Sequence, residues 1–254
     1  MRSMGRTAKP EPRRAVLPGT GRYQAVDVVR GGAIALMIAY HLCFDLAYFG
    51  LLRTDMYRDP FWIGTRSLIV TLFLLTVGVS LYLATRGGVR WPRFWRREGL
   101  IAAAALAVSA GSYLVFPRSW IFFGVLHFIA VASLLGLAFR RLGGANLALG
   151  AALVLLGITA AHPFFDQPMW QWFGLMTHKP VTEDYVPLLP WFGVVLLGLG
   201  LGQWLYGRRD VPAWARRESG HGAVRALAFA GRHSLFIYLA HQPLLFGLLW
   251  LVVR

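Results

Sequence analysis

The chain has 254 residues, of which 57% are hydrophobic and only 15% are charged. In a soluble domain about a quarter of the residues are charged, so this composition excludes an ordinary soluble fold and indicates an integral membrane protein. The net charge of +15 does not indicate a nucleic-acid partner, because the basic residues are placed as a membrane topology requires, and the single cysteine, Cys43, excludes an intrachain disulfide.

The N-terminal segment, residues 1–25, is basic and rich in Pro and Gly. It contains little that could form a core, so we predict a disordered cytoplasmic tail there. The apolar run that follows is too long for the h-region of a cleaved signal peptide and is typical of a signal anchor. We therefore expect a single transmembrane domain over residues 26–254.

Seven apolar segments follow the tail, and each approaches the length needed to cross about 30 Å of hydrocarbon as a helix. Strands are not expected, because an open strand in lipid leaves its backbone groups unpaired and the hydrophobicity does not alternate as in a barrel. The predicted spans are Arg30–Phe49, Phe61–Ala84, Leu100–Phe116, Trp120–Phe139, Leu147–Ala161, Leu188–Tyr206 and Ser234–Val253. The predicted fold is an all-α polytopic transmembrane helix bundle.

The basic residues orient this bundle. Of the 26 lysines and arginines, 20 fall in residues 1–30 and in every second loop, at residues 86–97, 140–141 and 208–232. By the positive-inside rule the N-terminus lies inside, and seven spans then place the C-terminus outside. We expect a multi-pass membrane protein.

The longest loop on the outer side is His162–Val186. It contains the acidic residues Asp166, Glu183 and Asp184 and the aromatic stretch Met169–Phe173. Two interpretations stay open: a lid over an outward cavity, or a connector that rests on lipid headgroups.

Five charged or ionisable residues stand out within the predicted spans: His41, Asp45, Arg66, His127 and His241. Such residues are costly at bilayer depth and normally face the bundle interior with a partner. At roughly 1.5 Å per residue, the three histidines lie about 11–18 Å from the cytoplasmic ends of their spans. They are therefore predicted near one layer, although a structural hydrogen bond to a carbonyl explains any one of them as well.

Asp45 follows His41 by four residues and shares its helix face. Asp45 and Arg66 lie at similar depths on antiparallel helices, which predicts an ion pair between them. That pair can simply set helix register. Alternatively, Asp45 orients His41 by accepting a hydrogen bond, or Arg66 binds an anionic substrate.

At the cytoplasmic end of the first span, Asp27 and Arg30 precede two glycines, and His233 stands at the inner end of the last span. Arg30 at a glycine-lined helix start suits a phosphate-bearing ligand from the cytoplasm. An Asp27–Arg30 pair that anchors the helix at the interface is the simpler explanation. His233 either contacts a phosphate or lies in the headgroup layer.

Four segments together resemble a known bacterial membrane family. They are VDVVRGGAIALMIAYHLCFDLAYFG (Val26–Gly50), FFGVLHFIAVASLL (Phe122–Leu135), PLLPWFGVVLLGLGLG (Pro187–Gly202) and GRHSLFIYLAHQPLL (Gly231–Leu245). That family, of unknown function, is grouped with the catalytic domain of heparan-α-glucosaminide N-acetyltransferase among transmembrane acyltransferases. The resemblance extends over nearly the whole chain from about Arg22.

The resemblance implies acyl transfer across the membrane, from a cytoplasmic acetyl-CoA or other acyl-CoA to a sugar-type amine or hydroxyl on the far side. The family's Asp-x-x-Arg-Gly start maps onto Asp27, Arg30 and Gly31. The position that matches His41 is an asparagine in the lysosomal enzyme, whose catalytic histidine lies in the loop after the first span. The corresponding stretch here, Leu51–Pro60, contains no histidine, so His41 would have to take over that role.

Acyl transfer from a thioester needs a base for the acceptor and a donor for the developing oxyanion. Our hypothesis makes His41 the base, Asp45 its orienting group, and His127 or His241 the oxyanion donor. Arg66 would hold the acceptor, while Asp27, Arg30 and His233 would contact the acyl donor. No bound cofactor or metal is required.

Other classes stay open. Midplane polar residues and the Pro187–Pro190 broken helix start also suit a transporter of a small solute or lipid-linked substrate. Paired histidines can bind haem, and His41, Asp45, His127 and His241 are suitable metal ligands by type. An inert assembly role and a homodimer are further options.

Overall fold

The computed structural model describes residues 22–208 and 210–253. Within these residues the secondary structure is entirely helical, with no strand, which confirms the all-α prediction. Most of the predicted tail lies outside the described residues, and its last two residues, Gln24 and Ala25, already belong to the first helix.

Seven apolar helices build the bundle: α1 (Gln24–Tyr48), α2 (Pro60–Thr85), α3 (Trp91–Val115), α4 (Val125–Phe139), α5 (Ala145–Thr159), α6 (Leu188–Tyr206) and α9 (Ser234–Val253). By length and composition α1, α2, α3, α6 and α9 can each cross a membrane, whereas α4 and α5 have 15 residues each. Four short elements complete the described chain: the 3₁₀ turns η1 (Pro163–Asp166) and η2 (Gln171–Phe173), and helices α7 (Ala213–Arg216) and α8 (Gly222–Arg232). The protein is therefore a multi-pass membrane protein, and its orientation stays a prediction.

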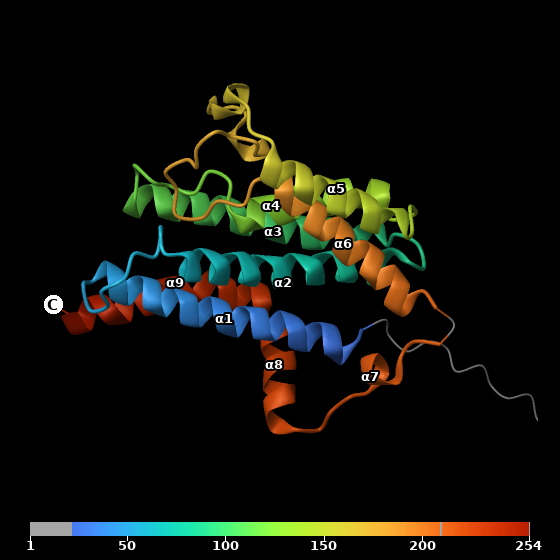
Figure 1. Cartoon of the computed structure of the whole chain (residues 1–254). Helices are drawn as coiled ribbons and strands as arrows, with labels where there is room; N and C mark the ends of the chain where they lie inside the picture. The colour runs from blue at the N-terminus through green and yellow to red at the C-terminus, as the bar shows by residue number, and fades with distance from the viewer. Residues whose placement is uncertain (1–21, 209, 254) are drawn as a thin grey trace, which may run out of the picture.

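Helix α2 lies in the middle of the bundle and contacts both α1 and α6. Helix α5 packs on α6, and α9 packs against α1 and α3. The start of α1 and the end of α9 lie at opposite ends of the bundle, and α8 runs across α1 (Figure 1).

The buried core lies between α2, α4 and α6, where Leu74, Phe128 and Leu196 are completely enclosed. The outer surface is also apolar: Leu106 and Leu114 on α3 are 68% and 82% exposed. Apolar side chains on both the inside and the outside are expected where hydrocarbon rather than water surrounds the bundle.

The crossing of α1 and α8 depends on two glycines. A Cβ on Gly31 would collide with the Leu227 carbonyl, and a Cβ on Gly231 would collide with the Asp27 carbonyl. Small residues allow two helix backbones to approach this closely. Because Gly231 is only three residues before α9, this crossing also sets where α9 begins beside α1.

Three predicted helix starts differ from the structure by five or more residues. Helix α1 begins at Gln24 rather than Arg30, and α3 begins at Trp91 rather than Leu100. Pro92 stands in the first turn of α3, where a proline is tolerated because its nitrogen needs no helical partner. The basic residues before Leu100 therefore continue the helix instead of forming a loop.

Helix α4 begins at Val125 rather than Trp120. The residues before it are turns and bends that pair with the outer loop: the Glu183 amide donates to the Ser119 carbonyl (3.1 Å) and the Val186 amide to the Phe123 carbonyl (3.3 Å). The outer loop therefore continues into the bundle next to the start of α4.

Candidate functional site between the first and last helices

The polar side chains of α1 and α9 face one another. Within Ser234–Val253, all of which the structure describes, His241 is the only residue of α9 classed as buried. Asp45 on α1 is completely buried, and His41 is half-buried. On a helix as apolar as α9, burial of a histidine in preference to leucines indicates that this interface was not selected for hydrophobic packing alone.

His41 and His241 form a close pair, with ring centroids 4.8 Å apart and an edge-on arrangement. The Nδ1 of His41 lies 2.9 Å from the Met37 carbonyl, and the Nδ1 of His241 lies 2.6 Å from the Tyr238 carbonyl. A carbonyl only accepts, so each Nδ1 carries the proton and each Nε2 presents a lone pair. The His241 Nε2 is buried without a partner in the described chain.

Asp45 is bound by Gln242 of α9, whose Nε2 donates to Oδ1 at 2.7 Å. The second oxygen, Oδ2, is buried and unpaired within the described residues, as is the Gln242 Oε1. The interface between α1 and α9 thus contains unpaired acceptor atoms on Asp45, His241 and Gln242. A hydroxyl or amine that enters it meets groups ready to accept its protons.

The predicted Asp45–Arg66 ion pair is wrong. Asp45 faces α9 and takes Gln242 as its partner, whereas Arg66 forms no ion pair in the part of the chain described. The i, i+4 spacing placed Asp45 and His41 on one face correctly, but the His41 proton is taken by the Met37 carbonyl, so Asp45 does not orient that ring. Helical spacing cannot show which neighbouring helix a face meets.

His127 has a different environment. In the first turn of α4, its Nδ1 accepts a hydrogen bond from the Gly124 amide (3.3 Å), and its Nε2 lies 3.1 Å from Ser109 Oγ. Ser109 donates its own proton to the Ile121 carbonyl (2.6 Å), so the imidazole Nε2 is the donor to Ser109. Both ring nitrogens have hydrogen-bond partners. Neither these bonds nor the ring contact of His127 involves His41 or His241.

Asp184, from the outer loop, is a residue that our sequence reasoning did not assign to the site. Its Oδ2 accepts from the Val125 amide (2.8 Å) and from the Tyr238 hydroxyl (3.1 Å), and it lies against Gly124. Burial raises the pKa of this carboxyl, although both hydrogen bonds and the nearby His127 and Lys179 oppose the shift. The backbone carbonyl of Tyr238 in turn accepts from the Nδ1 of His241. Tyr238 therefore links the outer loop to the histidine pair.

At the other end of α1, Asp27 and Arg30 form the ion pair considered as the simpler explanation, at 3.2 Å. Arg22 also pairs with Asp27 at 2.8 Å. Arg30 also donates to Ser80 Oγ (2.5 Å) and to the Gly231 carbonyl (3.3 Å), so it ties α1 to α2 and α8.

His233 is exposed, and its Nδ1 bonds to the Phe229 carbonyl of the preceding turn at 2.9 Å. It therefore caps α8 locally.

A second unpredicted group lies on α3. Glu98 is only 5% exposed, and both of its carboxylate oxygens are without hydrogen bonds in the described structure. Arg97 lies 3.5 Å from it and donates to Ser133 Oγ of α4 at 3.3 Å. A helix start placed at Leu100 left both residues in a loop, so their burial could not be anticipated.

The four-residue metal site that the sequence allowed is not formed. Across residues 22–208 and 210–253, no three or more His, Cys, Asp or Glu side chains are arranged to hold a metal ion. His41 and His241 are together, but His127 lies with Ser109, and Asp45 lies with Gln242.

The comparisons with known proteins identify the family. The model of the family described as "Heparan-alpha-glucosaminide N-acetyltransferase, catalytic" matches residues 22–243. No curated protein and no solved structure matches the chain. The matched region includes all of α1 to α8 and the part of α9 that contains His241 and Gln242. The chain therefore belongs to the heparan-alpha-glucosaminide N-acetyltransferase catalytic-domain family of membrane acetyltransferases.

Proposed function

We propose that this protein is a membrane-embedded acyltransferase that moves an acetyl or other acyl group from a cytoplasmic acyl-CoA to a sugar-type amine or hydroxyl. The observation that supports this most directly is the His41–His241 pair, whose two Nε2 atoms are free to accept protons inside the bundle. Membership of the acetyltransferase family supports the reaction class.

In this proposal the acceptor N–H or O–H donates to the Nε2 of His41, and the freed lone pair attacks the thioester carbon. The C–S bond then breaks, and the proton passes from the imidazolium to the departing thiolate, so protons balance over the cycle. The Met37 carbonyl holds the His41 ring in the required tautomer. A positioned base of this kind contributes about 10²–10⁴-fold to the rate.

Asp45 and Gln242 have roles beside this pair. The unpaired Asp45 Oδ2 is suited to hold the ammonium or hydroxyl group of the acceptor, a role that replaces the orienting role expected from sequence. The Gln242 amide uses one N–H on Asp45, which leaves its second N–H for the developing oxyanion. Arg66, without an ion-pair partner in the described chain, is available for an anionic group of the acceptor.

The test is acyl transfer in proteoliposomes supplied with acetyl-CoA and an amino sugar, followed by mass spectrometry of the product. We expect His41→Gln to lower the rate by at least about 100-fold. His221→Gln, at an exposed position before α8, is the matched control and should leave the rate unchanged. A folded His41→Gln protein with full activity would remove the proposed role of this histidine.

Transport is the second candidate. Leu189 has non-helical angles (φ −103°, ψ 135°) at the start of α6, and broken helices of this kind mark substrate paths in transporters. Flux of a labelled amino sugar into protein-containing vesicles without any acyl donor distinguishes the two. Flux without acyl-CoA favours transport, whereas product formation that requires acyl-CoA favours the enzyme.

A further inference from the structure

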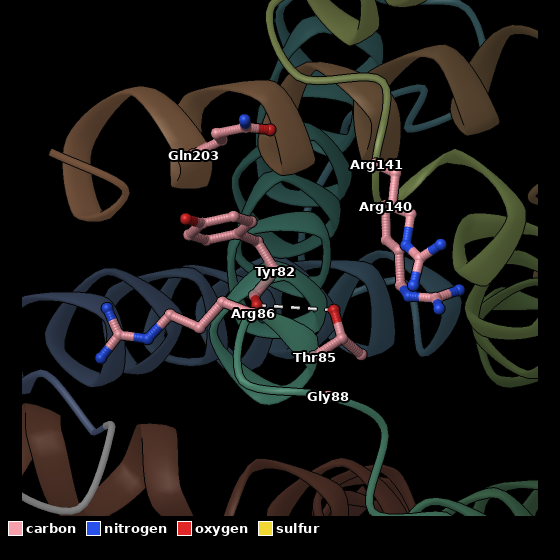
Figure 2. Close-up of a pocket in the computed structure, with 7 residues that line it drawn as sticks. All are labelled: Tyr82, Thr85, Arg86, Gly88, Arg140, Arg141 and Gln203. Atoms are coloured by element: carbon pink, nitrogen blue, oxygen red, sulfur yellow. Dashed lines mark hydrogen bonds between the residues drawn. The ribbon is translucent and has the colours of Figure 1, made fainter.

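A cavity of about 290 Å³ lies where α2, α4 and α6 end, away from the histidine pair. It is lined by Tyr82, Thr85, Arg86, Gly88, Arg140, Arg141 and Gln203 (Figure 2). Three of these residues are arginines and none is acidic. The positive-inside rule places this end of the bundle at the cytoplasmic headgroup layer.

The three arginines are not equivalent. Arg86 extends away from the other two (Figure 2). It donates to the Tyr206 carbonyl at 3.1 Å and lies over the Tyr23 ring. Arg140 and Arg141 lie side by side on the opposite wall (Figure 2). Arg140 uses one N–H on the Leu137 carbonyl at 2.9 Å, and neither of the pair forms an ion pair in the described part of the chain.

Two adjacent guanidinium groups repel each other, and apart from the Arg140–Leu137 bond their N–H donors have no protein acceptor in the described part of the chain. A phosphate relieves this arrangement, because its oxygens accept from the planar guanidinium forks with charge assistance. Gln203 sets a second requirement for the ligand, because its Oε1 is buried and unpaired within the described residues. That oxygen can only accept, so the ligand should also carry an N–H or O–H.

We propose that this cavity binds the phosphate of a phosphoester that bears an amine or hydroxyl a few bonds away, with Arg140 and Arg141 on the phosphate and Gln203 on the donor. Headgroups such as phosphatidylglycerol or phosphatidylethanolamine have this chemistry, as does a soluble phosphorylated ligand. The volume lies at the lower limit of small-molecule pockets and suits one headgroup better than a whole nucleotide. The site is separate from the acyl-transfer proposal.

The lipid arm of the test uses native mass spectrometry of the purified protein with phosphatidylglycerol, phosphatidylethanolamine, phosphatidic acid or phosphatidylcholine added. We expect Arg140→Gln/Arg141→Gln to reduce phosphatidylglycerol adducts at least fivefold relative to wild type. The matched control, Arg93→Gln/Arg96→Gln, removes two exposed charges from α3 that do not line this cavity and should leave the adducts unchanged. Equal losses of phosphatidylglycerol adducts in both double variants would show that the lipid binds through overall surface charge, and this would overturn the proposal.

Gln203→Leu tests the second contact. It should weaken phosphatidylglycerol and phosphatidylethanolamine binding but leave phosphatidic acid, which lacks the extra donor group, unaffected. If it weakens none of these lipids, the assignment of Gln203 is wrong. Should the double variant fail to fold, Arg141→Gln alone at its exposed position provides the same comparison.

The soluble arm uses delipidated protein and thermal unfolding with inorganic pyrophosphate. A stabilising shift that Arg140→Gln/Arg141→Gln abolishes, and Arg93→Gln/Arg96→Gln does not, assigns the cavity to a soluble phosphate. No effect of the Arg140–Arg141 substitutions in either arm would overturn the proposal.

Discussion

His127 and the His41–His241 pair differ in how many of their ring nitrogens have hydrogen-bond partners. At the start of α4, both ring nitrogens of His127 have partners, Gly124 and Ser109. Between α1 and α9, each imidazole has one satisfied nitrogen and one that presents a lone pair, and the His241 Nε2 is buried without a partner in the described residues. An unsatisfied buried polar group costs about 1–3 kcal/mol. The difference therefore separates a histidine that stabilises the fold from a pair kept at a cost to stability.

The largest effect should follow from His241→Leu. This change removes one hydrogen bond to a helical carbonyl but also removes an unpaired buried nitrogen, so the two contributions nearly cancel and the thermal midpoint stays near wild type. Acyl transfer should fall by at least about 100-fold, because one of the two free proton acceptors is lost. Unfolding curves in detergent and rates in proteoliposomes measure both. A strongly destabilised protein would show that His241 is as structural as His127.

The opposite result is expected for His127→Ala. The Gly124 amide and Ser109 lose their partner, which should lower the free energy of unfolding by about 2–3 kcal/mol. Activity per folded molecule should remain near wild type, since neither ring nitrogen is free for chemistry. A stable protein with severely reduced turnover would break the comparison.

Asp184 should make stability depend on pH. Burial raises its pKa above 3.8, so the folded protein holds this proton more tightly than the unfolded chain does. The stability that results is fully present below the unfolded pKa and is lost as the pH rises through the raised folded pKa. Asp184→Asn keeps an oxygen for Val125 and Tyr238 and should flatten this dependence. Asp184→Ala loses both bonds and should cost about 1–3 kcal/mol.

Thermal midpoints of wild type and both Asp184 variants, measured from about pH 3 to pH 8, test this sign, because the ordinary pKa of an aspartic acid lies at the acidic end of that range. A wild-type protein that gains stability as the pH rises would contradict it, provided that Asp184→Asn abolishes the gain.

The smallest effect is expected for Tyr238→Phe. It removes one hydrogen bond to Asp184 and leaves the Tyr238 carbonyl for His241, so the cost should be about 1 kcal/mol. Combined with Asp184→Asn, it should add little, because both changes act on the same contact. Additive losses in the double variant would show that Tyr238 and Asp184 act separately.

Much of the fold could be predicted, because lipid restricts the choices. The α6 and α9 ranges agree with the predicted spans, since apolar runs end sharply at Gly207 and begin sharply after His233. The starts of α3 and α4 could not be predicted from hydropathy. Helix α3 continues through basic residues that hydropathy assigns to a loop, and the segment before α4 is not helical but pairs with the outer loop.

The candidate site was only partly predictable for a related reason. Depth along a helix follows from residue count, which placed His41 and His241 at similar levels, and their rings lie 4.8 Å apart. Direction does not follow from residue count, so Asp45 was assigned to Arg66 rather than to Gln242. Asp184 was assigned to a surface loop, because nothing local shows that such a loop returns into the bundle.

The amino-acid sequence by itself determined that this chain is a membrane protein, that it forms helices, and which polar residues lie within them. Hydrocarbon excludes backbones whose polar groups are not hydrogen-bonded, and it tolerates few charges. Only the tertiary structure decided which side chains meet. The rotation of each helix about its axis depends on packing with every neighbour at once. That rotation satisfies both ring nitrogens of His127, whereas it brings His41 and His241 together and leaves the His241 Nε2 unpaired in the described residues.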